Sequence, residues 1–176
     1  MLVRVLGIGY PAIICRNMEE TISFYERALG MRVLFIEPNR DDAESVQALL
    51  DAGSGTRLLL VGPVDPKMKL AESQLGVGSL QYLSLRVSGS ELDAAYHELA
   101  RAGVQASEEI RRGYERLVFL EDPSGVLITL TAWTREPPEG SDEAEILRRA
   151  AALREAAGTP YVEDEHLRQA IAESQA

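Results

Sequence analysis

The sequence predicts an α+β protein made of two tandem βαβββ modules followed by a helical C-terminal extension. Three observations predict this fold. Apolar, strand-forming residues precede an amphipathic helix that ends at Gly30, and the same succession begins again at Leu80 and ends at Gly103. Tyr10 and Tyr82 lie 72 positions apart, which indicates an internal duplication. After the second module, the pattern changes to a proline-rich linker and two helical stripes.

The first module covers about residues 5–62. Its helix follows from apolar residues at helical spacing and from the glycine that ends it. Its hairpin follows from Gly53-Ser54-Gly55, which separates two apolar runs. The expected elements are a strand over 2–15, a helix over 18–29, a strand over 31–37, and hairpin strands over 45–52 and 56–61.

A connector over 63–78 leads to the second module, which covers about residues 79–133. Met68, Leu70 and Leu75 suggest that the connector is partly packed. The final hairpin turn contains Asp122-Pro123-Ser124-Gly125, in which proline presets φ and glycine accepts a positive φ. The expected elements are a strand over 80–87, a helix over 90–101, and strands over 104–110, 115–120 and 126–132.

The tail, 134–176, starts with a linker that contains Pro137 and Pro138 and so disfavours a helix. Ser141 is the expected N-cap of a helix that Gly158 ends, and 164–174 predicts a second helix. The apolar stripes of these helices are Ile146, Leu147, Ala150, Leu153 and Ala157, then Leu167, Ala170 and Ile171. Such stripes dock either on the same chain or on a second subunit, and the alternative is a free acidic tail.

Composition excludes several partners. The formal net charge of −10 and a pI near 4.7 leave no basic face for nucleic acid. No apolar run is long enough for a membrane span, so we expect no membrane partner. A single cysteine and an N-terminus without a signal-peptide pattern favour a cytoplasmic protein.

The order and spacing of two motifs resemble a known family. They are Phe24-Tyr25-x4-Gly30 at the end of the first helix and Asp122-Pro123-Ser124-Gly125 in the last hairpin. Within a duplicated βαβββ pattern over about residues 5–133, they resemble the vicinal oxygen chelate superfamily, which includes glyoxalase I, bleomycin-resistance proteins, extradiol dioxygenases and epimerases. The resemblance implies that each sheet curls into a half-cup and that paired modules enclose a small-molecule site.

The resemblance also implies where a metal ion would bind. In metal-using members, a His near the start of each module's first strand and a Glu on each last strand converge on one divalent ion. Here these positions fall on Tyr10, Tyr82, Leu59 and Thr129. None is an imidazole, carboxylate or thiolate, the donors that divalent ions need. We therefore expect that the family metal is lost and that the protein needs no cofactor.

Strand alternation predicts which residues would line the cup. The predicted ligand-binding residues are Tyr10, Arg57, Leu59, Tyr82, Ser84, Arg86, Thr129 and Thr131. The two arginines would clamp a carboxylate or a phosphate. In the alternative interpretation, the tyrosines fill a closed cup and the arginines form structural ion pairs. Cys15 is expected in the core, and Arg111-Arg112-Gly113-Tyr114 forms a loop at the rim of the cup.

The function that we expect is binding or sequestration of a small organic molecule, as in the bleomycin-resistance branch. A first alternative is a lyase or isomerase that works without metal, with Tyr10 or Tyr82 as the acid and Arg57 or Arg86 holding the substrate. A second is a glyoxalase- or dioxygenase-like enzyme whose metal ligands lie elsewhere, and a third is a scaffold with a filled cup. The catalytic residues stay unassigned. Because family members commonly pair modules, we expect a homodimer, which the tail would clasp.

Overall fold

The structure is a computed structural model that describes residues 3–72, 74 and 76–175. It divides into two compact units. The first comprises Met1–Gln81 and Glu121–Val126, and the second comprises Tyr82–Leu120 and Leu127–Ala176.

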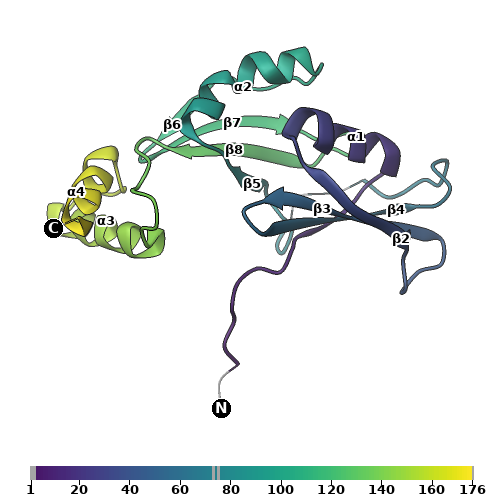
Figure 1. Ribbon diagram of the computed structural model, residues 1–176, viewed down its shortest axis with the longest axis horizontal. Coiled ribbons are helices and arrows are strands. Elements are labelled where there is room, and N and C mark those ends of the chain that lie inside the picture. Colours follow the sequence, from purple (N-terminus) through teal and green to yellow (C-terminus); the bar gives the residue numbers. More distant parts are fainter. Residues whose placement is uncertain (1–2, 73, 75, 176) are drawn as a thin grey trace. The chain divides into compact units, whose positions relative to one another are not determined.

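The first unit contains one four-stranded sheet and one helix (Figure 1). The sheet order is β1-β4-β3-β2, with β1 parallel to β4 and the other neighbours antiparallel. Asn17 caps α1 by accepting the N–H of Glu20, and Gly30 ends it in the left-handed conformation. Its elements are β1 (Ala12–Ile14), α1 (Met18–Leu29), β2 (Arg32–Pro38), β3 (Ser45–Gly53) and β4 (Thr56–Pro63).

The core of this unit lies on the side of the sheet that α1 covers (Figure 1). Tyr25 and Thr21 of α1 are fully buried. Alternate residues of the strands are buried with them, as strand periodicity requires. These strand residues are Ile13, Ala48, Leu50, Leu58 and Leu60.

The turn Glu121–Val126 belongs to the first unit, although it joins two strands of the second. Asp122 is buried and its carboxylate accepts the N–H groups of Ser124 and Val126 at 2.8 and 2.9 Å. The Tyr25 hydroxyl donates to the same carboxylate at 3.3 Å. The Ser124 hydroxyl in turn accepts the N–H of Arg16 at 3.0 Å.

The second unit repeats the first and adds the tail (Figure 1). Its sheet order is β5-β8-β7-β6, again with the first strand parallel to the last. Ser88 and Glu91 form a capping box at the start of α2. Its elements are β5 (Leu83–Arg86), α2 (Gly89–Arg101), β6 (Ile110–Arg112), β7 (Glu115–Glu121), β8 (Leu127–Trp133), α3 (Glu143–Ala157) and α4 (Asp164–Ser174).

Strand register confirms the duplication. Ala12 pairs with Leu59 in the first sheet, and Ser84 pairs with Thr129 in the second. Ala12 and Ser84 are 72 positions apart, and Leu59 and Thr129 are 70 apart, as the sequence repeat predicts. The α+β architecture of two βαβββ modules with a helical extension is therefore correct.

The two tail helices pack against the second unit's own sheet. Trp133 of β8 forms a buried cluster with Ile146, Ala150, Leu167 and Ala170. Of the predicted stripe, Leu147 and Leu153 pack at the edge of this cluster, whereas Ala157 is exposed. The apolar faces of the tail are thus used within the chain.

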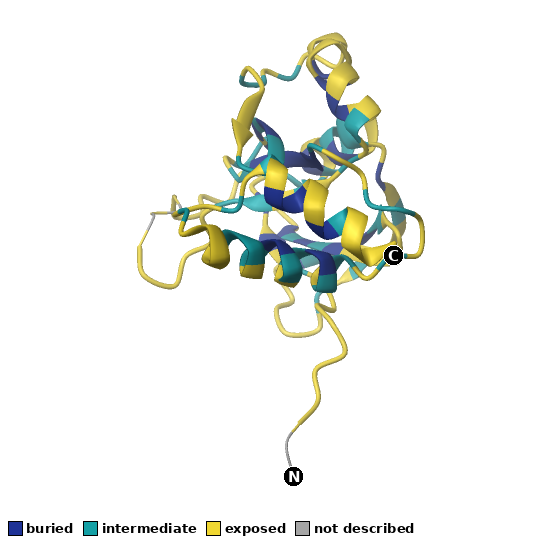
Figure 2. Cartoon of the chain, turned by 90° about the vertical axis from the view of Figure 1, so that its left-hand side faces the viewer, coloured by how far each residue is buried: buried dark blue, intermediate teal, exposed yellow. Residues whose placement is uncertain are grey.

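Four local predictions are wrong. The first strand spans only Ala12–Ile14, because residues 3–10 are irregular and exposed (Figure 2). The strand expected over 80–87 shortens to Leu83–Arg86. The N-cap of α3 is Asp142, whose side chain accepts the N–H of Glu145, rather than Ser141.

The strand expected over 104–110 is replaced by one bridge, Ala106 to Leu120, and by the short β6. The Ser107 hydroxyl accepts the N–H of Phe119 at 2.9 Å and so takes the place of a backbone carbonyl.

The connector is less packed than expected. Met68 and Leu70 are 37% and 40% exposed, and Leu75 lies outside the described residues. Over the part of the chain that the structure describes, no helix combines the length and apolar character that crossing a bilayer requires.

Candidate functional site

The predicted cup residues fall into two groups, one on each unit. Tyr10, Arg57 and Leu59 belong to the first unit, and the other five belong to the second. Each group is therefore described on its own sheet. We call the sheet side that bears these residues the cup face.

In the first unit, burial follows the predicted alternation. Ile13 and Cys15 are 6% and 0% exposed, whereas Ile14, on the other side of β1, is 71% exposed. The same holds on β4, where Leu58 and Leu60 are buried while Arg57 is exposed and Leu59 is half-buried. Tyr10 precedes β1 and is 49% exposed.

Strand register adds cup-face residues that sequence reasoning missed. Leu59 pairs with Leu49, and Leu49 pairs with Phe35, so these three side chains share one face. One register step along, the Gln47 amide donates to the Glu37 carboxylate at 2.8 Å. Alternation within β2 and within β3 shows which residues of each strand share a face. Only the pairing register shows that these faces lie on the same side of the sheet.

In the second unit, three hydroxyl groups form a row across β5 and β8. Ser84 and Thr131 lie 2.9 Å apart, and Thr129 and Thr131 lie 3.4 Å apart, between hydroxyl oxygens. Thr129 is fully buried and Ser84 is exposed, so the row runs from the interior to the open side of β5. Ser84 is the exposed member of the row, and its hydroxyl can both donate to and accept from polar atoms of an organic ligand.

Tyr82 lies just before β5, beside an aromatic ring and an arginine. Its ring meets that of Phe119 edge to face, with 6.1 Å between centroids. The Arg112 guanidinium donates to the Tyr82 hydroxyl at 3.4 Å.

Arg86 is the most strongly engaged of the predicted residues. Its guanidinium lies over the Trp133 ring, 5.2 Å from the centroid, and pairs with Glu136 at 3.4 Å and with Glu143. The hydrogen bond to Glu143 raises the pKa of Arg86. Arg86 is therefore an arginine that already binds two carboxylates of its own chain. Arg57, by contrast, is an exposed residue that faces Asp51 in the strand register.

The residues at the family's metal positions do not fit a divalent ion. The Pro11 carbonyl accepts the N–H of Leu59 at 3.0 Å, which places Tyr10 next to this strand pair. The register equates Leu59 with Thr129. Two phenols, an alkyl side chain and a hydroxyl are poor ligands at neutral pH. Within residues 3–72, 74 and 76–175, three His, Cys, Asp or Glu side chains nowhere gather as a metal site would require.

Cys15 lies outside the cup face, as expected. It is fully buried, and its sulfur packs so closely on β4 that a Cβ at Gly62 would lie 2.8 Å from it. Burial raises the pKa of this thiol, which is the opposite of what a nucleophile needs.

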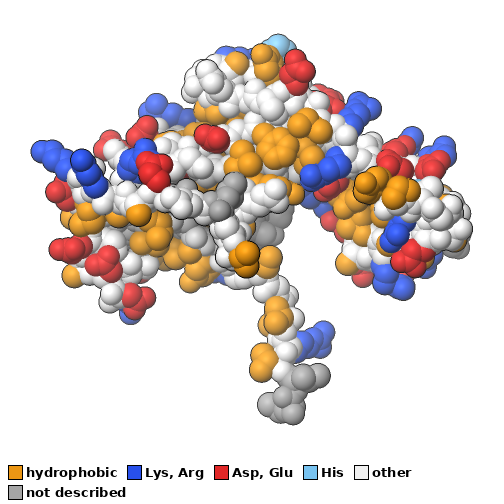
Figure 3. Space-filling view, turned by 180° about the vertical axis from the view of Figure 1, so that it is seen from behind, with side chains coloured by type: hydrophobic (Ala, Val, Ile, Leu, Met, Phe, Trp, Pro, Cys, Tyr) orange, Lys and Arg blue, Asp and Glu red, His pale blue; other side chains and the backbone are white. Residues whose placement is uncertain are grey.

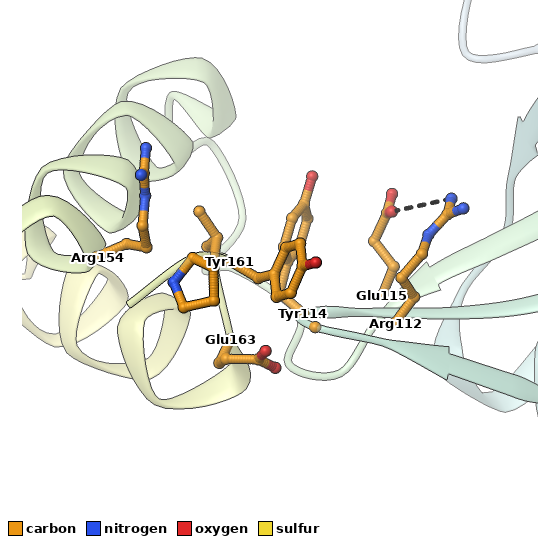
Figure 4. Close-up of a pocket in the computed structure, with 9 residues that line it drawn as sticks. Arg112, Tyr114, Glu115, Arg154, Tyr161 and Glu163 are labelled. Atoms are coloured by element: carbon orange, nitrogen blue, oxygen red, sulfur yellow. Dashed lines mark ion pairs between the residues drawn. The ribbon is translucent and has the colours of Figure 1, made fainter. Parts of the chain in front are cut away.

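The loop expected at the cup rim also meets the tail. Gly113 lies at the turn between β6 and β7, and a Cβ there would lie 2.3 Å from the carbonyl oxygen of Val162. Around this contact lies an open groove of about 720 Å³. Tyr114 and Tyr161 line it, and Figure 4 shows Arg154 of α3 on one side of them and the Arg112–Glu115 ion pair on the other. Burial raises the pKa of Tyr114.

Comparison with known proteins gives a consistent result. The model of the Glyoxalase/Bleomycin resistance protein/Dioxygenase superfamily matches residues 7–130. A relative from Bacillus subtilis (strain 168), named "Putative ring-cleaving dioxygenase MhqA", is 24% identical over 126 residues, which are 71% of this chain and 39% of that protein. The chain therefore spans about two fifths of the curated relative that it matches.

Solved structures share the fold. A glyoxylase/bleomycin resistance protein/dioxygenase domain from Frankia sp. EAN1pec has a TM-score of 0.62 and 16% identity, covering 78% of this chain and 96% of that one. The fosfomycin resistance protein FosX from Listeria monocytogenes, complexed with Mn(II) and sulfate ion, has a TM-score of 0.56 and 13% identity, covering 74% and 95%. Similarities at this level of identity establish the fold alone.

Proposed function

Because the chain belongs to the Glyoxalase/Bleomycin resistance protein/Dioxygenase superfamily, we propose that it binds a small organic molecule on the cup face of its second sheet and does so without the family's metal ion. One observation carries the proposal. The strand positions that would supply metal ligands bear Leu59 and Thr129, and Thr129 belongs to the hydroxyl row with Ser84 and Thr131. A row of hydroxyl groups with one exposed member, Ser84, thus includes a position where the family would need a metal donor.

The apolar surroundings support the same proposal. In the second unit, the half-buried Tyr82 lies just before β5, the strand of Ser84, and packs on Phe119. An apolar wall with a few fixed polar groups is the usual composition of a small-molecule site. Binding or sequestration needs nothing more.

Ligand screening tests the proposal. Small aromatic and hydroxylated compounds are titrated against the protein, and binding is followed by the fluorescence of Trp133, the protein's single tryptophan. For any compound that binds, Ser84→Ala should weaken the affinity by about tenfold, the cost of about one lost hydrogen bond. Ser174→Ala, at the end of α4, serves as the matched control. An unchanged affinity in Ser84→Ala would remove the hydroxyl row from the site.

A second candidate, a lyase or isomerase that works without metal, is favoured by one contact. The Arg112 guanidinium donates to the Tyr82 hydroxyl, so the oxygen accepts one hydrogen bond and its proton stays free for a substrate. Turnover of a bound compound that Tyr82→Phe abolishes, while binding persists, would support this candidate over sequestration.

A further inference from the structure

Arg86 lies where a ligand on the second sheet would meet it. Its side chain is 43% exposed and shares the cup face with Ser84, two residues earlier on β5. It lies opposite Thr131 in the strand register, so it adjoins the hydroxyl row. An arginine in this place would normally favour a carboxylate or a phosphate.

Two glutamates of the tail already form ion pairs with Arg86. Glu136 pairs with one Arg86 nitrogen at 3.4 Å, and Glu143 pairs with another. The Trp133 ring covers the guanidinium at 5.2 Å from the ring centroid. One positive and two negative charges leave the neighbourhood of Arg86 with a net charge of −1. A ligand anion would therefore meet repulsion here instead of attraction.

Both glutamates are held in place by the rest of the unit. The other Glu136 oxygen accepts the N–H of Gly89, at the start of α2, at 3.1 Å. Glu143 begins α3, which Ile146 and Ala150 anchor in the Trp133 cluster. Because the carboxylates are tethered, their effective concentration at Arg86 exceeds that of a dissolved anion at ordinary concentrations.

We propose that Glu136 and Glu143 neutralise Arg86 and thereby make the cup face of the second sheet select uncharged organic ligands over anionic ones. This inference rests on the proposed function. It assigns the tail a role in specificity, and it replaces the expectation that Arg86 clamps a carboxylate or a phosphate.

A matched pair of probes tests the inference: benzoate and its uncharged analogue benzamide, titrated against Trp133 fluorescence. The proteins are the native chain, Glu136→Gln/Glu143→Gln, and the control Glu139→Gln/Glu173→Gln, which changes the net charge equally at tail carboxylates outside the Arg86 ion pairs. We expect the native and control proteins to prefer benzamide, and the first variant to gain about tenfold or more in benzoate affinity with little change for benzamide.

The two single variants, Glu136→Gln and Glu143→Gln, should each show an intermediate gain in benzoate affinity. This graded result would show that the gain in the double variant comes from the lost charges and not from release of the tail. Benzoate binding that is unchanged in all variants while benzamide binds would overturn the inference and leave the proposed function standing. Failure of both probes to bind any of the proteins would count against the proposed function, and the inference would fall with it.

Discussion

Tyr25 and Asp122 form a buried hydrogen-bonded pair in the first unit, away from the cup face. Tyr25 is fully buried and Asp122 is 5% exposed. Burial raises the pKa of both groups, and the negative charge of Asp122 raises that of Tyr25 further. The pair is thus a structural feature, since it joins α1 to the turn Glu121–Val126.

Tyr25→Phe should destabilise the protein by about 1–3 kcal/mol, because the buried Asp122 carboxylate loses one of its donors. Denaturant unfolding measures this change. Tyr96→Phe is the control, since Tyr96 is 57% exposed. An equal effect of the two substitutions would contradict a stabilising role for the Tyr25–Asp122 hydrogen bond.

The same residue predicts a pH dependence. Unfolded tyrosine titrates near pH 10, and burial raises the pKa of Tyr25 above that value in the folded state. The stability that depends on the protonated phenol is therefore fully present below about pH 10 and declines as the pH rises further. Above pH 10, the free energy of unfolding should fall more steeply in the native protein than in Tyr25→Phe. Parallel curves would show that Tyr25 does not contribute.

At the level of elements, the tail and the β6–β7 turn are fitted to each other. Gly113 has a φ of +61°, and a Cβ at this position would collide with the Val162 backbone, so both its conformation and its lack of a side chain are required. The contact places the tail loop beside the sheet, while the Trp133 cluster anchors both tail helices.

Gly113→Ala should destabilise the tail more than Gly103→Ala does. Both glycines have a positive φ, and each substitution costs about 1–2 kcal/mol of backbone strain. Only at Gly113 does the new Cβ meet backbone, at 2.3 Å from the Val162 oxygen, whereas nothing lies within 4 Å at Gly103. Limited proteolysis after residue 134 measures tail release. Equal protection of the two variants would refute the contact.

Most elements could be predicted because their signals are local. Helix periodicity, Asn17, Gly30 and Gly158 mark the helices in the sequence itself. The choice of Asp142 over Ser141 could not be made, since both are good caps one residue apart. Sequence alternation also identified the faces of β1 and β4.

The side chains that pair with the site residues could not be predicted from local sequence patterns. Glu136 is 50 residues from Arg86 in the chain, and no periodicity connects them. The structural ion pairs named as an alternative for the arginines are present at Arg86. Ligand binding stays a prediction for the other residues, Tyr10, Arg57, Leu59, Tyr82, Ser84, Thr129 and Thr131.

At the scale of the whole molecule, we propose that the protein forms a homodimer through its first unit. Val3, Val5, Leu6 and Ile8 are 79–94% exposed, and Figure 3 shows hydrophobic side chains on this N-terminal segment. Burial of these apolar side chains against a second copy of the chain would be favourable. The tail's apolar stripes, in contrast, are packed within the chain.

Sedimentation velocity tests this proposal. Deleting residues 1–9 should shift a dimer to the monomer, because the exposed apolar segment is removed while β1 and the core stay intact. A dimer that persists without this segment, or a native protein that is monomeric at all concentrations, would contradict it.

We propose that this member of the superfamily binds its ligand without the family's metal ion. Elemental analysis of protein purified without chelators, with Mn, Fe, Ni and Zn added back and then removed by dialysis, tests it most directly. We expect far less than one metal ion per chain, because the positions at Tyr10, Leu59, Tyr82 and Thr129 offer no suitable donors. Metal that survives dialysis at about one ion per chain would contradict it and would require ligands elsewhere in the protein.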